Sequence, residues 1–335
     1  GYPEKALPWL TLGLEEYKEN EEFLAAMADC YRSGERNTKA ISFYNKLIDK
    51  NPYNPSYWTG LAKCHFSQQE FDKAVEACDF ALAADDKFGE AHIIRAHSLF
   101  HLENETEAIQ EYQLALQSKS LPPDFAHMFI GLAYANQEKW ELAYRSYEQA
   151  MEIIGDDNSP ILSDIYSNEI FCLSKLGRYE EAHQLCEKAK KQLPESVEIY
   201  LQEGRLYLEE DKFEEAKQCW AVALQYAPEA ETLVQIGNYS LDYGMVENAR
   251  LCFEEAKKQD PDYPGINGRL ASICMILRDH KGFQKYNQMS ETPLNIEMIQ
   301  EMLSQNTDKD ILQNLETFMN ELDDVNDGET EEENN

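Results

Sequence analysis

The stretch from Pro55 to Phe88 carries a 34-residue pattern that constrains the fold more than any other feature of the sequence. It predicts two amphipathic helices joined by a short polar turn. The apolar and small residues at helical spacing are Trp58, Leu61 and Ala62, followed by Phe71, Ala74, Cys78 and Ala81. One such pair is too small to bury its own apolar face, so pairs of this kind must stack on one another.

The same pattern recurs along most of the chain. Repeats are expected to begin near Glu21, Pro55, Gly89, Asp124, Ser163, Val197, Ala230 and Pro264. A small residue at the place where the two helices of a pair meet recurs at Ala40, Ala74, Ala108, Ala143, Ala182, Ala216 and Ala249. Such a regular period is typical of an all-α solenoid. About eight units therefore account for residues 21–290.

These residues resemble the tetratricopeptide repeat, with its W-x2-L-G-x2-Y, A-x3-F and terminal Pro pattern. The resemblance covers about residues 21–290 and implies a right-handed α-solenoid of helix–turn–helix units. The Gly of the first helix is present as Gly131, Gly204 and Gly237. In the eighth unit Phe283 replaces the usual Ala, so we expect its second helix to pack differently.

The two ends depart from the repeat. Residues 1–20 resemble the second helix of a partial repeat, which suggests either a piece cut from a longer chain or an N-terminal cap. Residues 291–322 are predicted to form C-terminal capping helices, with binding to another protein as the alternative. Residues 323–335 are acidic and lack large apolar side chains, so they are predicted to be disordered. A longer loop at 155–160 predicts two arms, 21–155 and 163–290.

Composition narrows the class of partner. The formal net charge is −33, which disfavours nucleic acid and anionic membrane surfaces. No apolar run approaches 18 residues, so we expect no membrane insertion. Several of the eight cysteines fall at small, inward-facing repeat positions, which favours reduced core thiols and a cytoplasmic protein.

No catalytic motif is present in the sequence. It contains no phosphate-binding GxxxxGK[ST] or GxGxxG loop and no GxSxG elbow. His97 and His101 have the spacing of two metal ligands on one helix. However, no Glu follows His97, so the zinc-protease motif is absent, and histidines that line a groove without binding metal are commoner than metal ligands. We therefore predict no enzyme activity, no cofactor and no metal site.

The resemblance implies that binding residues lie on the concave face, on the first helix of each unit. The places that point there predict a peptide-binding groove made by Thr59, Lys63, Phe66, Ile93, His97, Phe100, Phe125, Met128, Leu132, Phe171, Leu201, Arg205 and Asn238. The middle of this set is apolar and would supply anchors, while Lys63, Arg205 and Asn238 would orient a backbone or carboxylate. Alternatively, a tight superhelix buries some of these side chains.

One known use of the family is a clamp for the acidic C-terminal tail of heat-shock chaperones. The clamp resembles Lys-x3-Asn, Asn and Lys-x3-Arg in three adjacent first helices. Here the corresponding pairs are Ala25/Asp29, Thr59/Lys63, Ile93/His97 and Met128/Leu132. Since no three adjacent units reproduce the clamp, we predict that this chain does not bind such a tail.

The function predicted from the sequence is a non-catalytic adaptor or scaffold that binds a protein or peptide partner, as a peptide or helix, in its concave groove. The alternative is an accessory repeat region of a larger protein whose N-terminal part carries an enzymatic or membrane-anchoring role. A third possibility is a small-ligand-binding protein with a dry pocket under Phe125 and Phe171.

Overall fold

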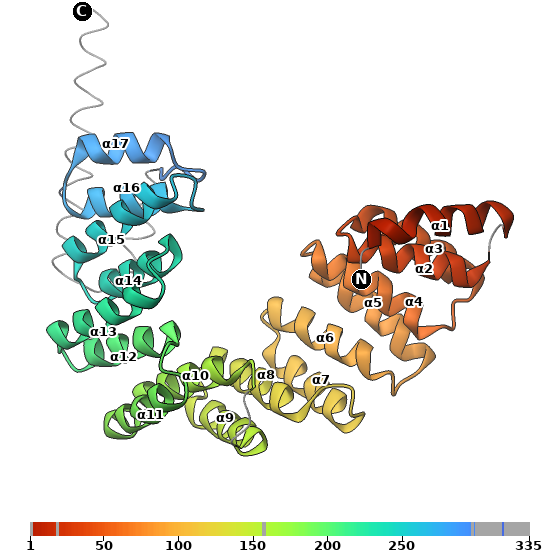
Figure 1. Cartoon of the computed structure of the whole chain (residues 1–335), viewed down its shortest axis with the longest axis horizontal. Coiled ribbons are helices and arrows are strands. Elements are labelled where there is room, and N and C mark those ends of the chain that lie inside the picture. Colours follow the sequence, from red (N-terminus) through yellow and green to blue (C-terminus); the bar gives the residue numbers. More distant parts are fainter. Residues whose placement is uncertain (1–2, 18–19, 156–158, 296–297, 299–316, 318–335) are drawn as a thin grey trace, which may run out of the picture. The chain divides into compact units, whose positions relative to one another are not determined.

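A computed structural model describes residues 3–17, 20–155, 159–295, 298 and 317. These residues form seventeen helices and no strand, which confirms the all-α class (Figure 1). Most of the predicted capping segment 291–322 and all of the predicted tail 323–335 lie outside the described residues. The chain divides into two compact units, residues 1–182 (unit 1) and residues 183–335 (unit 2).

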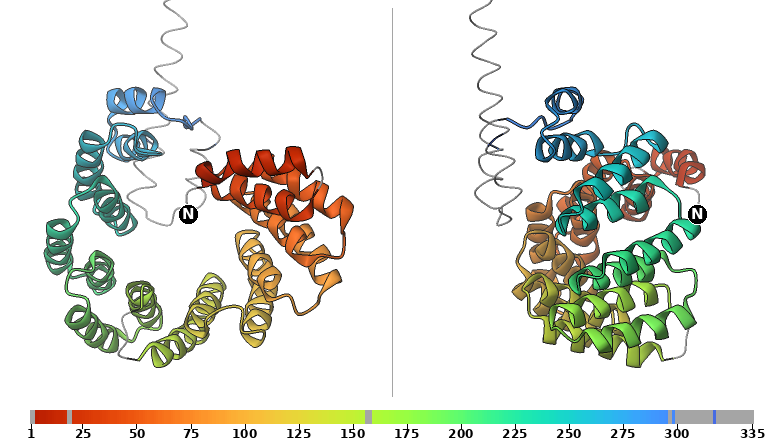
Figure 2. Two further views of the ribbon diagram at one scale, coloured as in Figure 1. Left: turned by 45° about the vertical axis from the view of Figure 1, so that its right-hand side comes forward. Right: turned by 90° about the vertical axis from the view of Figure 1, so that its left-hand side faces the viewer.

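Unit 1 is a series of antiparallel helix pairs that follows the order of the chain. Its helices are α1 (Pro3–Glu16), α2 (Glu21–Ser33), α3 (Asn37–Lys50), α4 (Pro55–Ser67), α5 (Phe71–Ala84), α6 (Gly89–His101), α7 (Glu105–Gln117), α8 (Pro123–Asn136), α9 (Trp140–Ile154) and α10 (Leu162–Lys175). Each helix packs on the next one in the chain, and Figure 2 shows this succession from two further sides.

Unit 2 continues the pattern. Helix α11 (Tyr179–Gln192) crosses the division between the units. The remaining helices of unit 2 are α12 (Val197–Glu209), α13 (Phe213–Tyr226), α14 (Ala230–Asp242), α15 (Val246–Gln259), α16 (Ile266–Ile276) and α17 (His280–Gln288). They pack as the pairs α12–α13, α14–α15 and α16–α17.

Small residues and large rings hold each helix pair together. The helix-contact alanines, among them Ala74, Ala143 and Ala216, have no solvent exposure. At Gly131 an added Cβ would lie 2.6 Å from the Tyr147 ring, and at Gly204 it would lie 2.2 Å from the Trp220 ring. Gly237 meets the Phe253 ring in the same way, at 2.4 Å. The ring of the second helix therefore lies directly on the backbone of the first, which is why glycine occupies this place in three units.

The turn inside each pair has a constant geometry. One residue in each turn adopts a left-handed backbone, and these residues are Glu35, Gln69, Glu103, Glu138, Gly177, Asp211, Gly244 and Arg278. The next residue donates its N–H back to the first helix, for example Asn104 to Leu99 O at 2.9 Å. This is the Schellman arrangement that closes a helix C-terminus. Six of the eight turns adopt it without glycine.

The division into units differs from the expected arms. The sequence suggested a boundary at the long loop 155–160, but the compact units meet between Ala182 and His183, inside α11. Helix α10 remains packed on α9 across the loop, with Ile165 and Tyr166 fully buried. The extra residues therefore lengthen the loop without separating the helices that it joins.

All eight cysteines are free thiols, and five of them are buried. Burial raises the pKa of Cys64 and Cys78, to about 11 and about 12, so these thiols are protonated and unreactive near neutral pH.

Among the described helices, none has the length and apolar character required to cross a bilayer.

Candidate peptide-binding face of the first helices

Burial separates the predicted groove residues into two groups. Three of the thirteen are buried in the core, namely Thr59, Met128 and Leu201. The Thr59 hydroxyl donates to Pro55 O at 2.9 Å, so its hydrogen-bonding capacity is used within its own helix. These three side chains contribute to packing. The half-buried residues are Lys63, Phe66, Ile93, His97, Phe100, Phe125, Leu132, Phe171, Arg205 and Asn238.

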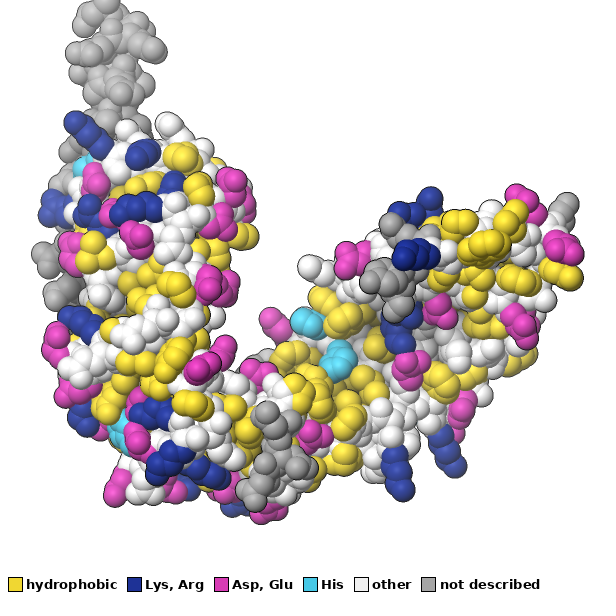
Figure 3. Space-filling model, viewed as in Figure 1, with side chains coloured by type: hydrophobic (Ala, Val, Ile, Leu, Met, Phe, Trp, Pro, Cys, Tyr) yellow, Lys and Arg dark blue, Asp and Glu magenta, His cyan; other side chains and the backbone are white. Residues whose placement is uncertain are grey.

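Rings from α4, α5, α6, α7 and α8 meet in unit 1 and form what we call the aromatic cluster: Phe66, Phe71, His97, His101, Tyr112 and Phe129. The His101 ring stacks on Phe71 with centroids 4.5 Å apart and an interplanar angle of 8°. Phe66 lies 5.5 Å from His101 and 6.3 Å from His97. His97 in turn meets Phe129 edge to face at 4.7 Å. Figure 3 shows histidines among hydrophobic side chains over α6.

His97 is the polar centre of this cluster. Its Nδ1 lies 2.7 Å from the Tyr112 hydroxyl. Burial, assisted by the neighbouring His101, lowers the pKa of His97 to about 4. His97 is therefore neutral at physiological pH. An uncharged imidazole surrounded by rings can contact apolar groups and still offer one nitrogen to a polar group.

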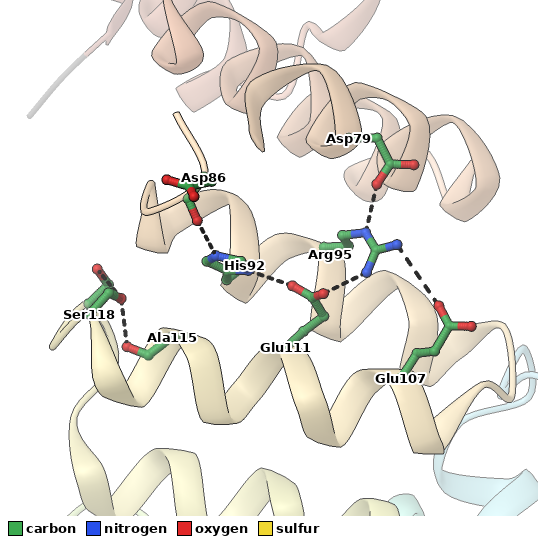
Figure 4. Close-up of polar contacts among 9 residues, drawn as sticks. Asp79, Asp86, His92, Arg95, Glu107, Glu111, Ala115 and Ser118 are labelled. Carbon is green, nitrogen blue, oxygen red and sulfur yellow. Dashed lines mark hydrogen bonds and ion pairs between the residues drawn. The ribbon is translucent and has the colours of Figure 1, made fainter. Parts of the chain in front are cut away.

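Beside the cluster, a polar network fixes the positions of three helices (Figure 4). Arg95 on α6 donates to Asp79 on α5 at 2.7 Å and to Glu111 on α7 at 2.6 Å. The second oxygen of Glu111 lies 2.6 Å from Nδ1 of His92. His92 and Glu111 are both buried, so these charge-assisted contacts are shielded from water. The network holds α6 at a fixed distance from both neighbours and so positions His97 and His101.

Charged groups flank the aromatic cluster. Lys63 on α4 forms an ion pair with Glu90 on α6. Farther along unit 1, the Lys175 ammonium lies 5.6 Å from the Phe171 ring, and Trp140 meets the same ring edge to face at 5.4 Å. The ring of the predicted anchor Phe171 therefore already contacts a lysine and a tryptophan of this chain.

The corresponding face of unit 2 has a different chemistry. The Arg205 guanidinium lies over the Tyr239 ring at 5.7 Å, and Gln202 donates to the Tyr239 hydroxyl at 3.3 Å. Arg269 donates to the Asn238 side chain at 3.2 Å. Two predicted site residues, Arg205 and Asn238, are thus engaged in polar contacts within unit 2.

Four members of the aromatic cluster were not among the predicted groove residues, namely Phe71, His101, Tyr112 and Phe129. Phe71 and Tyr112 belong to second helices and Phe129 occupies the sixth place of a first helix, so none of them falls at a first-helix place that is expected to point to the concave face. His101 had a signal, since it follows His97 by one helical turn on the same face. In the described residues, no group of three or more His, Cys, Asp or Glu side chains is arranged to hold a metal ion.

The described residues define an α-solenoid of stacked helix pairs. Residues 126–161 and 173–235 match two tetratricopeptide repeat models, and residues 34–115 match the model described as anaphase-promoting complex, cyclosome, subunit 3. The chain contains tetratricopeptide repeats, as the sequence pattern suggested.

Several known proteins are similar to this chain. The chain is 23% identical to anaphase-promoting complex subunit 7 of Dictyostelium discoideum over 73% of its length, and 22% identical to human DnaJ homolog subfamily C member 7 over 76%. It spans only 41% and 56% of those two proteins. A tetratricopeptide repeat protein from Parabacteroides merdae superposes with a TM-score of 0.60 at 19% identity, covering 75% of this chain and 97% of that one.

Proposed function

We propose that the chain is a non-catalytic interaction scaffold and that unit 1 binds a peptide or helix across its first helices. An apolar side chain of the partner would lie against the aromatic cluster. The observation that carries this proposal is the set of rings around Phe66, His97 and His101, of which the first two are half-buried and His101 is exposed, and where His97 is uncharged. Rings gathered on a surface offer a large apolar contact that loses little conformational entropy on binding.

The net charge around the aromatic cluster indicates which charged residues the partner segment should carry. Residues 55–136, which span α4 to α8, hold 12 Asp and Glu against 5 Lys and Arg, a net of −7. Lys63 and Arg95, two of these five bases, are paired with carboxylates of the chain. A partner segment with Lys or Arg on either side of an apolar anchor complements this field.

The same charges support the prediction that no chaperone tail binds. An acidic tail would need several free cations, whereas the candidate positions offer Lys63, which is paired with Glu90, and the buried side chains Thr59 and Met128.

Similarity to a subunit of the anaphase-promoting complex supports a role in a multi-protein assembly. A cytoplasmic location remains a prediction, favoured by the free thiols.

Selection of peptides from a random phage-displayed library on the full chain tests the proposal. Enriched peptides should carry an aromatic or large aliphatic residue flanked by Lys or Arg. Calorimetry with synthetic versions should show that Phe66→Ala or His101→Ala lowers affinity at least about tenfold, since a ring that becomes buried on binding is a typical hot spot.

The matched control is Leu114→Ala on α7. Leu114 is a large apolar residue with 40% exposure, and it lies outside the aromatic cluster. Its removal should leave peptide affinity unchanged, and far-UV circular dichroism should show that all three variants keep their helices. Peptides that bind equally to the Phe66→Ala and His101→Ala variants would refute the proposed site.

A further inference from the structure

Basic side chains gather on α16 and α17 of unit 2, although the chain as a whole is strongly acidic. Residues 266–288, which span these two helices, hold four Lys and Arg against one Asp, a net of +3. The formal net charge of the whole chain is −33. Figure 3 shows Lys and Arg side chains over α16 and α17. A local excess of positive charge in an acidic protein attracts an anionic group to one place.

The bases on α15 and α17 differ in their partners. On α15, Arg250 pairs with Glu254 at 3.0 Å, and Lys258 pairs with Glu255 at 3.0 Å. Lys257 on α15 and Lys285 on α17 form no ion pair with a carboxylate among the residues that the structure describes. Their charges are therefore not neutralised within the described part of unit 2.

The ammonium groups of Lys257 and Lys285 lie against the same ring. Lys257 Nζ is 4.7 Å from the centre of the Tyr286 ring, and Lys285 Nζ is 5.1 Å from it. Lys257 also donates to the side-chain oxygen of Asn267 on α16, and the Asn267 amide nitrogen donates to Met289 O at 3.1 Å. These contacts hold the Lys257 amine where α15, α16 and the end of α17 meet.

This position favours an anion more than an isolated surface lysine does. Burial lowers the pKa of Lys257, and the neighbouring charge of Lys285 lowers it further. Both causes disfavour the charged form of the amine, and a carboxylate beside the two ammonium groups offsets both. An ammonium group has three donor hydrogens, and Asn267 accepts only one of those on Lys257. The remaining donors can bind a ligand.

We propose that Lys257 and Lys285 form a docking site for an acidic peptide segment of a partner protein, with carboxylates at alternate positions. In an extended peptide, side chains two residues apart project to the same side about 7 Å apart, which suits two ammonium groups around one ring. Nucleic acid is disfavoured, because a long polyanion would extend over the acidic remainder of the chain.

The docking site is separate from the binding face of unit 1 and from the chaperone-tail clamp. Unit 1 is expected to attract basic segments, so an acidic peptide distinguishes the two surfaces. Lys257 and Lys285 lie on second helices, whereas the residues of the clamp would lie on first helices. We therefore expect an internal acidic segment to bind without a C-terminal carboxylate.

Fluorescence anisotropy on the full chain tests the proposal with a labelled Glu-Gly-Glu-Gly-Glu-Gly-Glu peptide that ends in an amide. This peptide should bind at low salt and weaken as salt is added, whereas the same peptide with Gln in place of Glu should not bind. Lys257→Gln and Lys285→Gln should each raise the dissociation constant at least about fivefold, since each removes a charge-assisted contact. Glutamine at position 257 keeps a donor for Asn267, and far-UV circular dichroism should show unchanged helix content.

The matched control is Lys258→Gln, which changes the net charge by the same amount next to Lys257. Lys258 is paired with Glu255, so its replacement should alter the affinity less than about twofold. An acidic peptide that does not bind, or that binds the Lys257→Gln and Lys285→Gln variants as tightly as the wild type, would overturn the proposal. An equal loss in Lys258→Gln would also overturn it, because the attraction would then depend on net charge alone.

Competition identifies the class of partner. A single-stranded oligonucleotide with the same charge as the acidic peptide should displace it poorly. Displacement as efficient as that by the unlabelled acidic peptide would contradict the assignment of a peptide as the occupant.

Discussion

The first-helix faces of the two units differ in chemistry although their scaffolds are the same. In unit 1 the face centres on the rings of Phe66, His97 and His101. In unit 2 it centres on Arg205 and Asn238, which contact Tyr239 and Arg269. Behind both faces the same alanines and rings hold the helix pairs, as at Tyr147 and Trp220. The repeat thus fixes the backbone and leaves the face free to vary.

The largest expected effect is on the free energy of unfolding, and it concerns the buried ion pairs beside the two faces. In unit 2, Lys190 donates to the buried Glu203 at 2.9 Å, and the Cys219 thiol also donates to that carboxylate. Lys190→Met should therefore lower the free energy of unfolding by about 3 kcal/mol, because it leaves a buried carboxylate without a cation. In unit 1, Arg95→Met leaves Glu111 in contact with His92, so we expect a smaller loss of about 2 kcal/mol.

Equilibrium urea unfolding followed by circular dichroism measures both losses. The control is the double variant Lys190→Met with Glu203→Leu, which removes the carboxylate as well and should recover much of the stability. Equal losses for Lys190→Met and Arg95→Met would show that His92 does not compensate for the missing guanidinium.

The second prediction concerns pH and applies to unit 1. The folded state holds the pKa of His97 at about 4, below its ordinary value of 6.5, because the ring is buried. The unfolded chain therefore binds the proton first as the pH falls. The stabilisation by neutral His97 is complete above pH 6.5 and is lost between pH 6.5 and pH 4. Between pH 7 and pH 5 the free energy of unfolding should fall by about 1–2 kcal/mol from this residue alone.

Comparison of the wild type with His97→Gln in urea at both pH values isolates that contribution. Glutamine can keep a hydrogen bond to Tyr112 but does not titrate in this range, so the variant should lose less stability on acidification. The same pH dependence in both proteins would assign the acid sensitivity to other groups.

The sequence predicts the scaffold better than the face. The 34-residue period and the alanine pattern indicate the solenoid because helix packing requires small residues at fixed places. The first helices begin at Glu21, Pro55 and Gly89, as expected, whereas α16 begins at Ile266, two residues after the expected Pro264. Helix starts can be read in this way because capping and periodicity are local properties of the chain.

The candidate site depends on contacts between helices, which the sequence does not contain. Thr59 and Met128 fall at places that point to the concave side, but neighbouring helices cover them. Phe71 and Phe129 join the aromatic cluster because rings on adjacent helices meet, which one repeat's numbering does not reveal. The sequence suggested a boundary at the long loop 155–160, whereas the compact units divide between Ala182 and His183, because loop length does not report whether the flanking helices stay packed.

The smallest predicted effect concerns a feature that both units share, the left-handed turn residue. Glu103 in unit 1 has φ of 58° and Asp211 in unit 2 has φ of 59°, where a side chain costs about 1 kcal/mol relative to glycine. Glu103→Gly and Asp211→Gly should each raise the free energy of unfolding by roughly 0.5 kcal/mol, since glycine also gains freedom in the unfolded chain. Gly244→Ala, at φ of 72°, should lower it by about 1 kcal/mol. Urea midpoints measure all three changes. Equal gains at residues 103 and 211 would show that the turn belongs to the repeat, whereas a gain in only one unit would show that the neighbouring face also affects the turn.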